Sequence, residues 1–243
     1  MPGSLKTEAI VLRSIRFGEA DRVLHLYTPQ RGRLSAIAKG VRRAKSRFGG
    51  RLEPYFRLQL VLYEGRSELL TVTAAETVHP HAQLRQDARA LDGASRACDA
   101  VARLFADGEP HEGVFHLLAN HLALLDAEPA RATRGHALAF RLKLLLAAGF
   151  APQLAACAGC GDTEHVVGFS GAAGGVVCSA CEASAFPLDA EAHAFLVEAL
   201  GRPLVEWGGR DRVDPRMLRQ AERAITETAE HHGHVRLRVA SAG

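Results

Sequence analysis

Residues 22–52 read RVLHLYTPQRGRLSAIAKGVRRAKSRFGGRL, and here an alternating apolar segment passes into a long basic loop. The stretch contains nine Lys or Arg residues and no Asp or Glu. The cations are densest after residue 38, where the alternating pattern predicts the end of a strand. A loop this positive favours a polyanion as its ligand, because each neutralised phosphate releases condensed counterions. The alternative is a charged loop that is simply solvated.

Aromatic residues accompany this basic stretch. Tyr27 and Phe48 lie inside it, and Tyr55 and Phe56 follow it closely. Aromatic faces beside cations are typical of proteins that bind single-stranded nucleic acid, because bases stack on the rings while the cations hold the phosphates. The sequence therefore favours nucleic acid over a purely solvated loop.

Composition and charge divide the chain into two parts. It has 243 residues, 47% of them hydrophobic and 23% charged, which is typical of globular proteins. Residues 1–79 carry a net charge of +7, and residues 80–243 carry −4, so we expect two domains with different roles, the first basic. The first residues contain no secretory pattern, and the longest apolar run, residues 144–152, is too short to cross a bilayer. We therefore expect a cytoplasmic protein without a membrane partner.

The first part of the chain reads as a β structure. Alternating or β-rich segments are separated by turn residues such as Gly18 and the Glu64–Ser67 segment. Five short antiparallel strands in so few residues predict a small closed barrel, and the five-stranded barrel that binds oligonucleotides is the OB-fold. An SH3-like barrel is the alternative. The expected strands are 9–15, 23–28, 34–38, 54–63 and 69–78.

From Gln83 onward the apolar period changes from two to about 3.6, which predicts helices. Cys98 lies in the apolar stripe of the first helix and is expected to be a small buried side chain. His116, His121 and His136 lie within helical patterns and are interpreted as structural or surface residues. The expected helices run from about 83 to 105, from after Pro110 to about 125, from 131 to 148, from Asp189 to 201, and from Asp214 to 233.

Four of the five cysteines have the spacing of a metal site. Cys157 and Cys160 form one C-x2-C pair, and Cys178 and Cys181 form another after seventeen residues. Zinc ribbons use this spacing because each pair forms a tight knuckle that presents two sulfurs. Four thiolates leave no open coordination position, so we predict one structural zinc per chain. Redox chemistry at one C-x-x-C pair is the alternative.

Catalytic patterns are weak in this sequence. The glycine-rich segment between the cysteine pairs lacks the Lys and Ser or Thr of a phosphate-binding loop. Glu19 and Asp21 are paired acids in a turn, without further carboxylates or histidines nearby to complete a nuclease site. We expect a protein that is not an enzyme. A zinc-containing nuclease or another enzyme that modifies nucleic acid is the alternative.

Two segments of the first 80 residues have a recognisable pattern: EAIVLRSIRFGEADRVLHLYTPQRGRLSAIAKGVRRAKSRFGGRLEPY, residues 8–55, and LLTVTAAE, residues 69–76. They resemble the RecO family of bacterial recombination-repair proteins. The helical remainder, interrupted by the cysteine pairs, is similar to that family as well. The resemblance implies an α+β multidomain protein: an OB-fold domain at 1–80 and an α-helical domain at 81–243, with a four-cysteine zinc ribbon inserted at about 152–186.

The resemblance also implies a function and partners. Proteins of this family are non-enzymatic recombination mediators that bind single- and double-stranded DNA and anneal complementary strands. With the partner RecR they help to load RecA onto DNA covered by single-stranded DNA-binding protein (SSB). We therefore expect DNA, RecR and SSB as partners, RecA indirectly, and a nucleoid-associated location in a bacterial cytoplasm. The DNA-contacting residues implied here are Lys39, Arg42, Arg43, Lys45 and Arg47, with Arg33 and Arg51 as neighbours.

A site for the acidic and apolar C-terminal tail of SSB is predicted on the helix expected at 131–148. Phe140 and Leu144 lie one turn apart on one helix face, and Arg141 lies beside them. An apolar seam flanked by a cation is the surface that such a tail requires. The alternative is that this stripe is part of the core.

Overall fold

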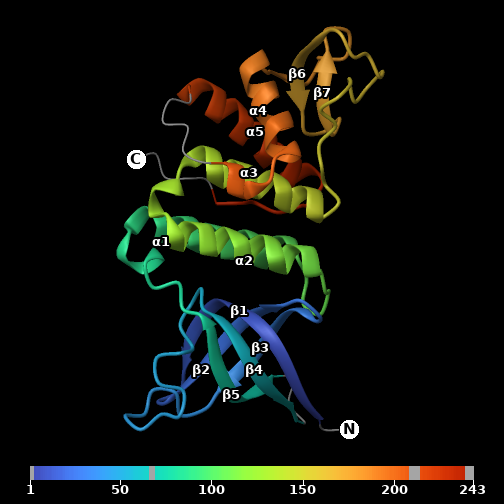
Figure 1. The fold of residues 1–243 in the computed structure, drawn as a ribbon. Helices are drawn as coiled ribbons and strands as arrows, with labels where there is room; N and C mark the ends of the chain where they lie inside the picture. Colours follow the sequence, from blue (N-terminus) through green and yellow to red (C-terminus); the bar gives the residue numbers. More distant parts are fainter. Residues whose placement is uncertain (1–2, 66–68, 208–213, 239–243) are drawn as a thin grey trace. The chain divides into compact units, whose positions relative to one another are not determined.

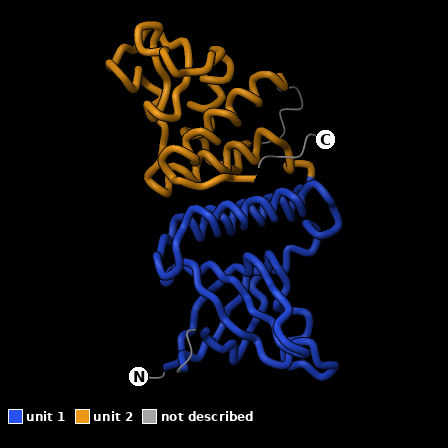
Figure 2. Tube along the Cα trace, turned by 180° about the vertical axis from the view of Figure 1, so that it is seen from behind, with its two compact units in different colours: residues 1–129 blue, residues 130–243 orange. Residues whose placement is uncertain are grey.

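The structure is a computed structural model that describes residues 3–65, 69–207 and 214–238. The chain forms two compact units, Met1–Pro129 and Ala130–Gly243, which Figure 2 shows in different colours. No helix in the described part of the chain is long and apolar enough to cross a membrane. Each unit is described by itself below.

The first unit contains the five predicted strands: β1 (Gly3–Phe17), β2 (Asp21–Thr28), β3 (Gly32–Ala38), β4 (Arg57–Glu64) and β5 (Leu70–His79). They close into a barrel in the order β1-β2-β3-β5-β4, because β1 pairs with both β2 and β4. Neighbouring strands are antiparallel except β3 and β5, which are parallel. This ring confirms the predicted α+β class with a five-stranded OB-fold barrel, and it is seen at the bottom of Figure 1.

The barrel closes around alternate residues of its strands. On β2 and β3 the inward residues are Leu24, Leu26, Ala36 and Ala38, all fully buried. The residues between them, such as Val23 and Ile37, point to the outer face and are only partly buried. The period of two in the sequence therefore reports which side of the barrel wall each residue occupies.

Two helices complete the first unit, α1 (Ala88–Leu104) and α2 (Glu112–Ala127), preceded by the short helix η1 (Leu84–Gln86). They lie side by side across one end of the barrel (Figure 1). Asp87 caps α1 by accepting hydrogen bonds from the backbone N–H groups of Arg89 and Ala90. Cys98 is buried in α1, as predicted. Compactness groups these helices with the barrel in a unit that ends at Pro129, and the predicted domain boundary between residues 80 and 81 stays a prediction.

The described part of the second unit contains three α-helices, two short helices and a small sheet. The helices are α3 (Arg134–Ala147), α4 (Ala190–Gly201) and α5 (Pro215–His231), with short helices η2 (Pro129–Arg131) and η3 (Leu204–Glu206). The side chain of Asp214 caps α5, whereas the side chain of Asp189 makes no capping bond to α4 and pairs with Arg216. The sheet contains β6 (Val166–Ser170), β7 (Gly175–Cys178) and β8 (Phe186–Pro187) in the order β7-β6-β8. Residues 208–213, before α5, and residues 239–243 lie outside the described part of the chain.

Candidate nucleic-acid interface and metal centre

The basic loop, residues 39–56, follows β3 and is a series of turns anchored to the barrel. Backbone hydrogen bonds from Ser46 to Arg43 and from Gly49 to Ser46 hold successive turns at 3.0 and 3.3 Å. Phe48 and Leu52 insert into the barrel core and are 1% and 2% exposed. The loop therefore has a fixed course although it contains no helix or strand.

The start of the loop is tied to the turn between β1 and β2. The carboxylate of Asp21 accepts a hydrogen bond of 2.7 Å from the backbone N–H of Gly40. The backbone N–H of Arg42 donates to the carbonyl of Ala20 at 2.9 Å. Asp21 thus positions the loop, and this role accounts for one of the two acids that the sequence offered as a weak nuclease pair.

Most cations of the loop are exposed and unpaired. Within the described residues no ion pair involves them, although Arg47 donates to the carbonyl of Val72 at 3.4 Å and Arg51 to the carbonyl of Arg47 at 3.3 Å. Their charge is therefore available to an anion from outside the chain. These residues are Lys39, Arg42, Arg43, Lys45, Arg47 and Arg51.

Arg33 differs from the other predicted DNA-contacting residues. It lies on β3, and its guanidinium pairs with the carboxylate of Asp107 and donates to the carbonyl of Ala102 at the end of α1. An arginine that is already paired offers less charge to a phosphate, because a new contact must replace existing ones. The geometry therefore gives Arg33 a structural role between barrel and helix, and its contact with DNA stays a prediction.

The aromatic residues near the loop do not all have the role that the sequence favoured. Tyr27 is fully buried and packs edge-on against Phe105, with ring centroids 6.1 Å apart. Phe48 is part of the barrel core, and Arg85 lies over the ring of Phe56. Core packing thus covers the rings of Tyr27 and Phe48, so these two of the four aromatic residues offer no surface on which a base could stack.

Two exposed aromatic residues were missed by the sequence reading. Phe17 at the end of β1 is 54% exposed, and Tyr63 near the end of β4 is 44% exposed. Tyr63 alternates with the core residues Leu60 and Leu62, which was the available signal. Phe17 lies just beyond the predicted strand 9–15, so its face was not assigned.

The four cysteines of the second unit converge as their spacing predicts. The sulfurs of Cys157, Cys160, Cys178 and Cys181 all lie within 4.8 Å of one another, and the Sγ atoms of Cys160 and Cys178 are 3.6 Å apart. Within the first pair a tight turn brings the residues together: the N–H of Gly161 donates to the carbonyl of Cys157 at 2.8 Å. The arrangement is a possible metal site with four sulfur ligands.

The electrostatics of the cluster also suit a cation. The backbone N–H of Cys160, and then that of Cys178, stabilise the Cys157 thiolate and lower its pKa to about 6. Neighbouring thiols, Cys160 first, raise the pKa of Cys181 to about 12. Four adjacent thiols cannot all ionise without a positive charge among them, and a bound metal ion supplies that charge.

The ribbon, residues 152–187, is held against α5 at several points. A Cβ on Gly175 would lie 2.2 Å from the carbonyl oxygen of Gln153, so only glycine allows this close approach. The N–H of Gly171 donates to the Glu227 carboxylate at 3.2 Å, and the guanidinium of Arg223 lies 4.1 Å from the centroid of the Phe186 ring. The metal site is therefore carried on a hairpin that rests on a helix.

The predicted partner seam on α3 is buried. Phe140, Arg141 and Leu144 are 1%, 4% and 0% exposed. Arg141 pairs with the buried carboxylate of Glu222 on α5 at 3.4 Å and donates to the carbonyl of Arg238. The expectation of an exposed seam is therefore not met. The stripe and its cation serve the interior of the second unit, which was the alternative.

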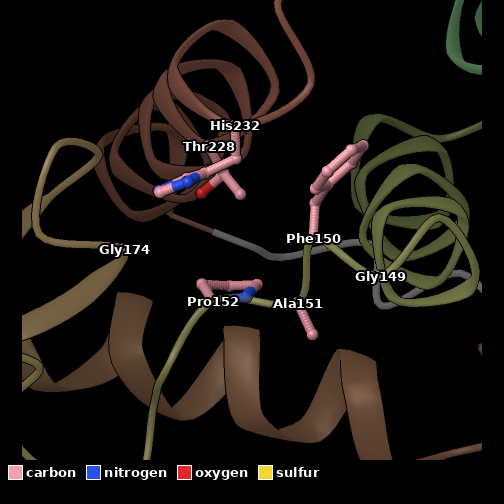
Figure 3. Close-up of a pocket in the computed structure, with 7 residues that line it drawn as sticks. All are labelled: Gly149, Phe150, Ala151, Pro152, Gly174, Thr228 and His232. Atoms are coloured by element: carbon pink, nitrogen blue, oxygen red, sulfur yellow. The ribbon is translucent and has the colours of Figure 1, made fainter.

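A small cavity of about 120 Å³ lies where the chain passes from α3 to the ribbon (Figure 3). Phe150, Pro152, Thr228 and His232 contribute side chains to its wall. The hydroxyl of Thr228 donates to the carbonyl of Ala224 at 2.8 Å, and Nε2 of His232 lies 2.8 Å from the carbonyl oxygen of Gly171. Both polar groups are thus engaged in the fold, so this cavity does not support the enzyme alternative.

Comparison with known proteins places this geometry in a family. The model of the recombination protein O N terminal matches residues 1–81, and that of the recombination protein O C terminal matches residues 85–239. The chain is 36% identical over 234 residues to DNA repair protein RecO of Anaeromyxobacter sp. (strain K), a match that covers 94% of this chain and 91% of that protein. It is 38% identical over 210 residues to DNA repair protein RecO of Rubrobacter xylanophilus, covering 83% and 82%. The chain therefore belongs to the RecO family of DNA repair proteins, which are non-enzymatic recombination mediators.

Proposed function

We propose that this protein binds single- and double-stranded DNA through its basic loop, anneals complementary strands, and acts with RecR to help load RecA onto DNA covered by SSB. One observation carries the DNA-binding part of the proposal. The barrel presents the exposed cations of residues 39–51 without acidic partners among the described residues, and the loop that holds them is anchored by Phe48 and Leu52. A fixed array of unpaired cations binds phosphates with little loss of conformational entropy.

The proposed contacts are to phosphates, and these carry no base information. Lys39, Arg42, Arg43, Lys45, Arg47 and Arg51 would bind the backbone of either strand type. Because such contacts are indifferent to sequence, two complementary strands of any composition can be held by the same surface. This property suits strand annealing, which has to work at whatever sequence is broken.

RecR, SSB and RecA enter the proposal through the family rather than through a site on this chain. With the seam at Phe140, Arg141 and Leu144 buried, the SSB tail has no assigned position here. A bacterial cytoplasm, in association with the nucleoid, is the location that this activity requires.

We further propose that the four cysteines hold one structural zinc ion. Tetrahedral zinc with sulfur ligands at about 2.3 Å separates the sulfurs by about 3.8 Å. The 3.6 Å between the sulfurs of Cys160 and Cys178 is close to that value. When bound, the ion would fill its coordination shell with protein sulfur and stabilise the hairpin. Metal analysis of freshly purified protein should find one zinc per chain, and a chain without zinc would contradict this assignment.

The test of the DNA-binding proposal is a charge reversal in the loop. Arg42→Glu with Arg43→Glu should weaken binding to labelled single and double strands. On single strands the salt dependence should fall by about 1.4 in slope for the two contacts, at about 0.7 each. A matched control reverses two exposed arginines elsewhere, Arg89→Glu with Arg236→Glu, and changes the net charge equally. If the two double variants bind alike, the loop is only a solvated one.

The enzyme alternative is tested in the same experiment. Complementary labelled strands are incubated with the protein, with and without Mg²⁺, and the products are separated by length. The proposal predicts duplex formation without shorter products. Among the described residues, the cysteine cluster is the one group of three or more potential metal ligands. Cleavage that depends on Mg²⁺ would therefore require a site that this chain does not otherwise indicate.

A further inference from the structure

The outer face of the barrel carries a continuous row of apolar and aromatic side chains that the basic loop does not explain. Strand register places Ile15 opposite Val23, Val23 opposite Ile37, Ile37 opposite Thr71, and Thr71 opposite Tyr63. The row therefore crosses all five strands, from β1 through β2, β3 and β5 to β4. Val23, Ile37, Thr71 and Tyr63 alternate with core residues such as Leu24, Ala36 and Leu62, and the pairing with Val23 places Ile15 on the same outer side of the wall.

The two ends of this row are exposed. Ile15 is 38% exposed, and Phe17, which follows it on the same face of β1, is 54% exposed. At the other end Tyr63 is 44% exposed, and its ring lies near Gly65 at the start of the β4–β5 turn. Exposed apolar groups at both ends of one row, with partly buried Val23 and Ile37 between them, form a surface that a ligand or partner could cover.

The protein itself covers only one part of this face. Farther along the same strands, Tyr27 is fully buried against Phe105, and Arg33 pairs with Asp107 beyond α1. Phe17 and Ile15 lie on the part of β1 that pairs with the first residues of β2, away from Tyr27. Within the described residues of the first unit, the helices thus pack over one end of the face and leave the row open.

Cations border the open part. Arg13 and Arg16 are exposed on β1, and Lys39 and Arg42 are exposed at the start of the basic loop. The loop is joined to the β1–β2 turn by the 2.9 Å bond from the N–H of Arg42 to the carbonyl of Ala20, three residues after Phe17. Glu19 is an exposed acid in this turn, and Asp21 is occupied by its bond to Gly40. The ring of Phe17 therefore lies in a region whose cations can contact phosphates.

We propose that Phe17 and Tyr63 stack the bases of single-stranded DNA, with Ile15, Val23 and Ile37 as the apolar floor between them. Four interstrand spacings of about 4.8 Å separate β1 from β4 around the barrel, roughly 19 Å. That arc suits the lower end of OB-fold site sizes, about 4 to 16 nucleotides. The face of strands 2 and 3, with the loops that follow strands 1 and 4, is also where the OB-fold binds oligonucleotides in general.

This inference rests on the proposed function and adds strand selectivity to it. The basic loop binds phosphates that single and double strands share, whereas stacking requires bases that are free of a partner. A duplex keeps its bases inside the helix, so it gains nothing from Phe17 or Tyr63. The row therefore makes the barrel prefer single strands, and a base leaves its ring when it pairs with the complementary strand.

The test separates bases from phosphates. Binding of the full chain is measured by fluorescence anisotropy with three labelled probes: oligothymidylate, an abasic deoxyribose-phosphate strand of the same length, and a duplex. Phe17→Ala and Tyr63→Ala should each weaken binding to oligothymidylate about 5- to 100-fold, the range for one lost stacked base. Binding to the abasic strand and to the duplex should stay at the wild-type level. Phe17→Trp and Tyr63→Phe should retain binding to oligothymidylate.

Val78→Ala is the matched control, because Val78 is 48% exposed on β5 but seven residues beyond Thr71. It should leave all three affinities unchanged. If Phe17→Ala weakens binding to all three probes equally, the substitution has damaged the fold. The Phe17→Trp variant then decides: the inference stands if it restores binding to oligothymidylate alone, and it is overturned if it does not. If both alanine variants bind every probe like wild type while the Arg42→Glu, Arg43→Glu variant loses binding, the stacking row is wrong and the proposed function stands. If wild type binds no probe, both fall.

Discussion

The barrel and the ribbon are both small β structures, but their interiors differ. Among the described residues, the barrel core contains thirteen buried apolar side chains, including Leu24, Leu58 and Leu60. The buried cluster of the ribbon contains Cys157, Val177 and Cys178, so two of its members are potential metal ligands. A five-stranded ring of this kind gains its stability from buried apolar area. Because the ribbon cluster is this small, we expect the ribbon to depend for its stability on the metal ion that its cysteines are proposed to hold.

Metal removal should therefore have the largest effect and should act on one region only. A strong chelator removes a metal-binding free energy of about 10 to 16 kcal/mol in comparable small zinc sites, and Cys160→Ser removes one of the four ligands. The backbone amides of residues 157–181 should lose their protection from hydrogen exchange, while those of β2, β3 and β4 keep theirs. Exchange followed by mass spectrometry measures both regions in one sample. If the ribbon stays protected after its metal is gone, it folds by packing, and the contrast with the barrel is wrong.

The two regions also differ in how much the sequence revealed. The ribbon is encoded locally, since a C-x2-C pair fixes its own turn, and all four ligands were predicted from spacing. The strands of the barrel were predicted from a period of two, but the parallel pairing of Ile37 with Thr71 joins residues far apart in the chain. Ile37 and Thr71 become neighbours only when the barrel closes, and no local sequence pattern predicts that closure. The row from Phe17 to Tyr63 was for that reason not foreseen.

The errors have a related cause. Tyr27 and Phe48 are close to cations in the sequence. In the fold, however, Tyr27 packs against Phe105 at the end of α1, and Phe48 lies in the barrel core. Arg141 stands beside an apolar stripe, but Glu222, more than eighty residues later, supplies its partner. Neighbours in the sequence show which residue types occur together. They do not show which side chains are exposed, because exposure depends on elements from elsewhere in the chain that pack over them.

A moderate effect is expected from acid at the barrel end near α1. His81 is 1% exposed, its Nδ1 lies 2.7 Å from the carbonyl oxygen of Tyr55, and burial lowers its pKa from 6.5 to about 4. The unfolded chain therefore binds a proton more readily. The contribution of neutral His81 to the free energy of unfolding is fully present above about pH 6.5 and is lost as the pH falls toward 4. The loss amounts to about 2 to 3 kcal/mol, at 1.36 kcal/mol per pKa unit.

The variant His81→Asn tests this, because Asn tolerates the positive φ of 46° found there and does not titrate. Its unfolding free energy should change less than that of wild type between pH 6.5 and 4. All three tyrosines of the chain, Tyr27, Tyr55 and Tyr63, belong to the first unit, so tyrosine fluorescence follows its unfolding. His116→Asn, at an exposed position of α2, should keep the wild-type slope. An unchanged slope in His81→Asn would assign the acid sensitivity to another group.

The smallest effect is expected at the fifth cysteine, which has the same chemistry as the ribbon ligands but the surroundings of a core residue. Cys98 is 2% exposed in α1, and burial raises the pKa of its thiol, so it stays protonated and binds no metal. Cys98→Ala removes one buried sulfur atom and should cost about 1 kcal/mol of stability, as small buried deletions do. Metal content per chain should stay at the wild-type value, whereas Cys160→Ala should abolish it. A fall in metal content in Cys98→Ala would mean that burial does not separate packing cysteines from ligands in this chain.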